Sequence, residues 1–187
     1  IEASFEKNPS IIFQKSIVTA NQKLRQMAAQ DTKLRGMGTT VVAATCMGKY
    51  LQVANVGDSR LYVVNDTIKQ ITTDHSYVEE MIRRGNLQRE YARSNPNKNI
   101  ITRAVGAKND VKADIYVVEL KPGDLVLMCS DGLSNMLEDE DIRMIIKRQR
   151  DIVEMAEKLV EAANNNGGKD NISVVLIEPF ADEVNYD

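Results

Sequence analysis

Three aspartates stand where strand-like apolar runs of the 187-residue sequence meet turns rich in glycine or asparagine. They are Asp58 in Gly-Asp-Ser-Arg, Asp131 in Ser-Asp-Gly and Asp170 in Lys-Asp-Asn-Ile. A carboxylate held at the end of a rigid strand suits a hard cation, which prefers oxygen ligands. If the strand before Asp131 and the strand after Asp170 are antiparallel neighbours, both acids meet at one edge of a sheet. Three unrelated turn aspartates are the simpler alternative, because Asp is common in turns and caps.

These carboxylates favour Mn²⁺ or Mg²⁺ over Zn²⁺, because the sequence offers no set of His and Cys ligands. Clustered carboxylates repel one another unless a cation lies between them. A pair of such ions can activate a bridging water and hold phosphoryl oxygens. The chemistry indicated is direct hydrolysis of a phosphate ester, without a covalent enzyme intermediate.

The single histidine, His75, would have to serve any Ser–His or Cys–His catalytic pair. It stands just before a predicted helix, and we expect a structural, hydrogen-bonding role for it. The two cysteines, Cys46 and Cys129, lie inside apolar runs, and we expect both to be buried. Free, buried cysteines favour a reducing compartment, so we expect a cytoplasmic protein.

The composition argues against two classes of partner. The 24 Lys and Arg residues and 27 Asp and Glu residues give a net charge of −3, which is no electrostatic footprint for nucleic acid. No apolar run approaches the roughly 20 residues that a membrane span needs. The length suits one domain with a substantial core.

The elements that must position the acids follow a pattern typical of an α+β fold. Helical spacing and capping signals predict helices over residues 9–34, 138–149 and 151–165. The polar stretch 76–99 opens with a capping-box spacing and indicates a surface excursion of short helices. Alternating or continuous apolar patterns predict strands over 39–47, 50–56, 61–64, 67–72, 100–105, 113–120, 125–129 and 171–177.

Six short motifs, taken together and in order, resemble the metal-dependent protein phosphatase family, type 2C, and most closely its bacterial serine/threonine branch. They lie in register over about residues 10–178, and are Gly-Met-Gly-Thr-Thr (36–40), Val-Gly-Asp-Ser-Arg (56–60), Thr-Asp-His-Ser (73–76), Ile-Thr-Arg-Ala-Val-Gly (101–106), Cys-Ser-Asp-Gly-Leu (129–133) and Gly-Lys-Asp-Asn-Ile (168–172).

The resemblance implies two packed antiparallel β-sheets flanked by helices, with two Mn²⁺ or Mg²⁺ ions bound between the sheets. Asp131 and Asp170 match metal ligands of the family, and Asp58 matches a residue that helps to bind a third, weaker ion in some bacterial members. Residues 76–99 match the mobile flap beside the active site. The implied activity is hydrolysis of phosphoserine and phosphothreonine in proteins phosphorylated by a serine/threonine kinase.

The family opens with strands that carry a phosphate-clamping Arg, an acidic pair and an Asp-Gly-Met-Gly-Gly motif, and this sequence contains none of them. We therefore expect residues 1–187 to form a single phosphatase-like domain that lacks its N-terminal strands and has no catalytic residue of its own. Three acids would leave two hard cations under-coordinated, so we expect the chain alone to be inactive. The alternative is a non-catalytic phosphatase-like module that binds a partner. A regulatory phosphatase with one dedicated partner would share the site and differ only in substrate.

Overall fold

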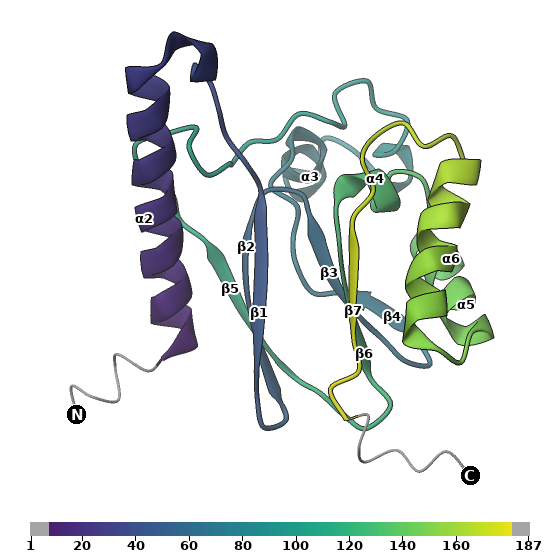
Figure 1. Cartoon of the computed structure of the whole chain (residues 1–187). Helices are drawn as coiled ribbons and strands as arrows, with labels where there is room; N and C mark the ends of the chain where they lie inside the picture. Colours follow the sequence, from purple (N-terminus) through teal and green to yellow (C-terminus); the bar gives the residue numbers. More distant parts are fainter. Residues whose placement is uncertain (1–7, 181–187) are drawn as a thin grey trace. The chain divides into compact units, whose positions relative to one another are not determined.

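The computed structural model describes residues 8–180, and Figure 1 shows its helices and strands. The chain divides into two compact units whose segments alternate along the sequence. The first unit contains residues 8–47, Leu51–Asp58 and Thr73–Val118, and the second contains Gly48–Tyr50, Ser59–Thr72 and residues 119–180. Each unit is built on one antiparallel sheet with its own helices, which confirms the predicted α+β class.

The first unit opens with the long helix α2 (Pro9–Gln30), which is shorter than the helix predicted over 9–34. The side chain of Asn8 caps its start by accepting a hydrogen bond from the N–H of Ser10. Asp31 takes an extended conformation and ends α2, and its carboxylate then caps the short 3₁₀ turn η1 (Thr32–Leu34). A residue that can cap a new turn therefore stops the helix before its periodic pattern ends.

The sheet of the first unit has the strand order β1 (Val41–Met47), β2 (Tyr50–Val56), β5 (Asp114–Glu119). Its core consists of buried apolar side chains from α2, β2 and the segment that leads into β5, namely Ile17, Ala54, Val56, Val105, Val111 and Ala113. The prediction that Cys46 is buried is wrong, because Cys46 lies near the exposed end of the edge strand β1. Cys129 is buried as expected.

Residues 76–99 contain only short helical pieces, as predicted: α3 (Tyr77–Arg83) and the 3₁₀ turn η2 (Arg89–Tyr91). Ser76 caps α3, and its Oγ accepts a hydrogen bond from the N–H of Glu79. The predicted strand over 100–105 does not form. Only isolated bridges occur there, because Ile101 pairs with Ser76 whereas Val105 pairs with Thr39.

The sheet of the second unit has the strand order β4 (Ile68–Gln70), β3 (Arg60–Val64), β6 (Leu125–Cys129), β7 (Val174–Ile177). Each neighbouring pair is antiparallel. The continuous apolar run of β6 forms a central strand, and a short helix, α4 (Asp131–Ser134), follows it almost at once.

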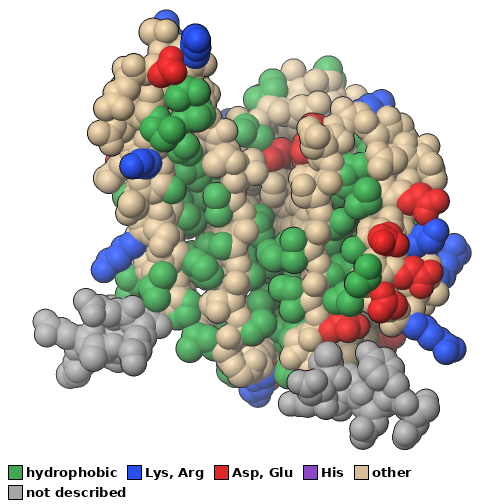
Figure 2. All heavy atoms as spheres, in the orientation of Figure 1, with side chains coloured by type: hydrophobic (Ala, Val, Ile, Leu, Met, Phe, Trp, Pro, Cys, Tyr) green, Lys and Arg blue, Asp and Glu red, His purple; other side chains and the backbone are tan. Residues whose placement is uncertain are grey.

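Two amphipathic helices, α5 (Asp139–Arg148) and α6 (Ile152–Asn165), lie side by side over one face of this sheet (Figure 1). The carboxylate of Asp151 caps α6. Figure 2 shows charges of both signs on the outer surface around α6. On this helix, Lys158 forms an ion pair with Glu161. The core beneath consists of fully or nearly buried side chains: Tyr62, Val64, Leu125, Leu127, Cys129, Leu133, Leu137, Ile142, Ile146, Met155, Leu159 and Ala163.

Candidate functional site

Asp131 is the first residue of α4, directly beyond the end of the buried strand β6. Its Oδ2 accepts a hydrogen bond of 3.1 Å from Nδ2 of Asn135, one helical turn later. Burial, and then the neighbouring carboxylate of Asp170, raise the pKa of the Asp131 carboxyl. The site therefore holds a half-buried carboxylate whose negative charge is poorly compensated.

Asp170 lies four residues before β7, and β7 pairs antiparallel with β6 so that Val174 faces Cys129. The structure therefore places Asp131 and Asp170 at the same end of two neighbouring strands, which confirms the predicted placement of these two acids. Oδ1 of Asp170 accepts a hydrogen bond from the N–H of Asn171 at 2.7 Å.

Two small residues hold the acid-bearing segments together. Oγ of Ser130 donates to the carbonyl of Asn171 at 3.0 Å and accepts from the N–H of Ser173 at 3.0 Å. A Cβ on Gly132 would lie only 2.3 Å from the carbonyl oxygen of Asn171, so the close approach of the two backbones requires glycine. The Ser-Asp-Gly sequence thus supplies one possible ligand and both of the residues that bring its partner segment close.

The third predicted ligand, Asp58, belongs to the first unit, where it follows β2 by two residues. Gly57 before it has φ +114°, and a Cβ at that position would meet Cγ2 of Thr40 at 2.4 Å. The turn that carries Asp58 is therefore fixed by a conformation that L side chains rarely adopt.

Among the residues that the structure describes, no three or more His, Cys, Asp or Glu side chains gather closely enough to hold a metal ion. Asp131 and Asp170 still fit a hard divalent cation, because they offer carboxylate oxygens and because their mutual repulsion would fall if a cation lay between them. Other oxygen donors must complete the roughly six ligands of such an ion.

His75 has the structural role that we predicted. The side chain is buried, Nδ1 accepts a hydrogen bond of 2.9 Å from the N–H of Gly57, and Nε2 lies 3.0 Å from Oδ2 of Asp114. Sequence reasoning missed Asp114 and its second partner, Arg103. Arg103 lies within one of the six motifs, whereas nothing in the sequence marks Asp114.

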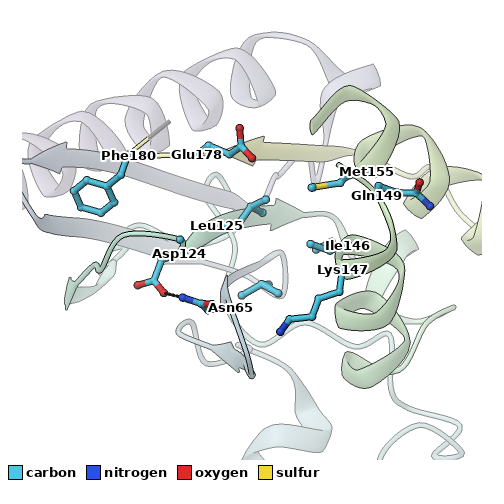
Figure 3. A pocket seen from close by; sticks show the side chains of 11 residues that line it. Asn65, Asp124, Leu125, Ile146, Lys147, Gln149, Met155, Glu178 and Phe180 are labelled. Atoms are coloured by element: carbon cyan, nitrogen blue, oxygen red, sulfur yellow. Dashed lines mark hydrogen bonds between the residues drawn. The ribbon is translucent and has the colours of Figure 1, made fainter. Parts of the chain in front are cut away.

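A separate cavity of about 260 Å³ opens in the second unit at the beginning of β6, whereas Asp131 follows the end of that strand. Figure 3 shows its apolar wall, which includes Leu125, Ile146 and Met155, and the hydrogen bond from Asn65 to Asp124 at its rim. The cavity brings together none of the predicted site residues.

None of the helices within residues 8–180 combines the length and the apolar character that a membrane span requires.

The sequence matches the protein phosphatase 2C family over residues 2–172. It is 42% identical over 166 residues to the serine/threonine phosphatase stp of Listeria innocua, a match that covers 88% of this chain and 66% of that protein. The fold is similar to that of the serine/threonine phosphatase Stp1 from Staphylococcus aureus, with a TM-score of 0.85 and 35% identity over 88% of this chain and 65% of that one.

A further solved structure has a TM-score of 0.82 and 30% identity, and the match covers 91% of this chain and 71% of that one. It is the catalytic domain of the serine/threonine protein phosphatase PstP in complex with two manganese ions. The chain thus spans about two thirds of the length of the relatives that it matches. Since the family match extends over most of the sequence, the chain belongs to the protein phosphatase 2C family.

Proposed function

We propose that this protein is a metal-dependent phosphatase that hydrolyses phosphoserine and phosphothreonine in proteins through a metal-activated water. The observation that carries the proposal is the meeting of Asp131 and Asp170 at one sheet edge, where burial and the second carboxylate raise the pKa of Asp131. Relatives that are named serine/threonine phosphatases support the reaction class. The neighbour with two manganese ions supports the choice of cofactor.

Asp131 and Asp170 would hold Mn²⁺ or Mg²⁺, two ions in all, and Asp58 would help to hold a third. The chemistry that these ions supply when bound is a water activated for attack and positive charge near the phosphoryl oxygens. The chain's own contribution is to fix the carboxylates before any ion arrives. Asn135 orients the carboxylate of Asp131, and Ser130 sets the spacing between the two segments.

Residues 76–99 would act as the flap that contacts phosphorylated substrates of a serine/threonine kinase, within a single phosphatase-like domain of residues 1–187. We propose a cytoplasmic location because Cys46 and Cys129 are both free. We further propose that residues 1–187 have little activity on their own, because two or three carboxylates leave most positions around hard cations to water.

The test is hydrolysis of p-nitrophenyl phosphate and of a phosphothreonine peptide by the complete gene product, with and without Mn²⁺. We expect Mn²⁺-dependent turnover that falls by about 100-fold or more in Asp131→Asn and in Asp170→Asn, since several kcal/mol of metal-derived stabilisation would be lost. The matched control is Asp66→Asn, which makes the same chemical change at an exposed carboxylate that pairs with Lys147. This control should turn over normally.

Unchanged turnover in both Asp131→Asn and Asp170→Asn would reject the phosphatase proposal. The same samples separate the phosphatase from the non-catalytic alternative. A protein that melts cooperatively, binds no Mn²⁺ and hydrolyses neither substrate would favour a phosphatase-like module that binds a partner.

A further inference from the structure

The ring of His75 is a buried cross-link within the first unit, only 7% exposed. Gly57 engages His75 twice: its N–H donates to Nδ1 at 2.9 Å, and its carbonyl accepts from the N–H of His75 at 2.9 Å. Because Nδ1 accepts a hydrogen bond from the backbone N–H of Gly57, it carries no proton, and the ring proton must reside on Nε2. Nε2–H then donates to Oδ2 of Asp114 at 3.0 Å.

Asp114 is itself held in place on its other oxygen. Oδ1 accepts from Nη1 of Arg103 at 2.6 Å, and the same nitrogen donates to the carbonyl of Lys112 at 3.0 Å. Burial pushes the pKa of Asp114 upward, but the hydrogen bonds from His75 and Arg103 outweigh it and leave that pKa below its usual value. Asp114 is therefore a stable anionic acceptor for Nε2–H of His75.

His75 also stands at the root of the segment 76–99. Its carbonyl accepts from the N–H of Thr102 at 2.8 Å, on the chain that returns from this segment. The next residue, Ser76, bridges to Ile101 and caps α3. Both ends of the segment 76–99 are thus joined beside the same imidazole.

The Gly57–Asp58 turn is held by hydrogen bonds with side chains elsewhere in the first unit. Gly57 has a positive φ, and it contributes no side chain that could anchor the turn. Its carbonyl receives a second hydrogen bond, 3.3 Å from Nδ2 of Asn55, which also donates to the carbonyl of Thr73. Oδ1 of the fully buried Asn55 has no hydrogen-bond partner within the described part of the chain, so Asn55 cannot hold the N–H of Gly57. Within residues 8–180, the acceptor for the N–H of Gly57 is Nδ1 of His75.

We propose that His75 is a positioning residue: its ring fixes the Gly57–Asp58 turn to the base of residues 76–99, and so sets the direction of the Asp58 carboxylate. The inference rests on the proposed function, in which Asp58 helps to hold a metal ion. It assigns His75 no contact with substrate or with the reacting atoms. His75 would affect the orientation of the Asp58 carboxylate, and through it the affinity for the metal ion.

Two substitutions separate the hydrogen bond that His75 accepts from Gly57 from the one that it donates to Asp114. His75→Asn keeps an acceptor close to the position of Nδ1 and loses the donor to Asp114, whereas His75→Gln keeps a donor close to the position of Nε2 and loses the acceptor for Gly57. In the complete gene product we expect His75→Gln to raise the Mn²⁺ concentration for half-maximal hydrolysis by about tenfold or more. We expect His75→Asn to raise it by no more than about threefold.

Amide hydrogen exchange at Gly57 gives a readout that is independent of activity. Exchange should be faster in His75→Gln than in the parent protein, and close to the parent rate in His75→Asn. Equal metal dependence and equal exchange in the two variants, or the reverse order, would overturn the proposal. If the parent protein hydrolyses nothing, the proposed function fails, and the order of exchange rates alone then decides whether His75 anchors the turn.

A measurement on the unsubstituted protein covers the case in which a variant does not fold. Nitrogen chemical shifts of the His75 ring report which ring nitrogen carries the proton. We expect the proton on Nε2 and a bare Nδ1 at neutral pH. A proton on Nδ1 would exclude the hydrogen bond from Gly57 and with it the positioning role.

Discussion

Asp114, the first residue of β5, and Asp131, which follows β6, are both partly buried, yet their surroundings shift their pKa values in opposite directions. Asp114, in the first unit, accepts hydrogen bonds from Arg103 and His75, and its pKa is lowered. Asp131, in the second unit, is half-buried near the carboxylate of Asp170, and its pKa is raised. The hydrogen bonds to the first carboxylate outweigh the cost of its burial, whereas the hydrogen bonds to the second do not outweigh its burial and the repulsion from Asp170.

Under the proposed function, the difference separates a structural carboxylate, Asp114, from a ligand-binding one, Asp131. A carboxylate that contributes only to folding is expected to be neutralised by its own chain, as Asp114 is. A pair of carboxylates held together by the backbone, as at Asp131 and Asp170, costs stability unless something positive binds there. The experiments below test each side of this contrast.

The largest loss of stability is expected from a side-chain atom placed between the segment that carries Asp131 and the segment that carries Asp170. Gly132→Ala places a Cβ 2.3 Å from the carbonyl oxygen of Asn171, and backbone cannot move aside as a flexible side chain can. We expect a loss of about 2–3 kcal/mol in the free energy of unfolding, measured with urea, together with weaker Mn²⁺ binding. The control is Gly36→Ala, where φ is +82° and nothing lies within 4 Å, so that only about 1 kcal/mol of backbone strain is added. If the two variants were equally stable, the close approach at Gly132 would be disproved.

A smaller loss of stability, caused by the loss of favourable electrostatic interactions, is expected when Asp114 is substituted. Because the pKa of Asp114 is lowered in the folded state, its carboxylate adds stability at pH values above its usual pKa, and this stability is lost as the pH falls through the folded-state pKa. Asp114→Asn should therefore lower the free energy of unfolding at pH 7 by about 1 kcal/mol, a figure reduced for its partial exposure. The deficit should shrink below about pH 4.

The exposed pair of Glu119 and Lys49 offers a control of the same kind. Glu119→Gln removes an ion pair in which both side chains are more than half exposed, so its effect at pH 7 should be smaller than that of Asp114→Asn. An Asp114→Asn deficit that persisted unchanged at acidic pH would show that packing, and not charge, holds this carboxylate.

The sheet edge that carries Asp131 and Asp170 could be predicted from the sequence because local signals define it. The apolar run of β6 and the last strand are both visible, and antiparallel pairing then brings Asp131 and Asp170 to one end. The bounds of α2 and the exposure of Cys46 could not be predicted in the same way. Both depend on where an element ends or which strand lies at an edge, and a periodic pattern does not encode that.

Asp114 illustrates what sequence patterns leave out. Its partners His75 and Arg103 are 39 and 11 residues away in the chain, so only the folded structure brings the three together. The segment 100–105 has the composition of a strand, but its backbone hydrogen bonds go to three separate places: Asn97, the stretch His75–Tyr77, and Thr39. Tertiary context has overridden local preference there.

Thermal unfolding of the complete gene product and of its Asp131→Asn variant, each with and without Mn²⁺, tests the central claim most directly. Without metal, Asp131→Asn should unfold at the same temperature as the parent or slightly higher, because it removes a carboxylate that Asp170 repels. Mn²⁺ at about 100 times its dissociation constant should raise the unfolding temperature of the parent by roughly 5–10 °C and that of the variant by much less. An equal rise in both proteins would contradict the claim that Asp131 and Asp170 form the metal-binding edge.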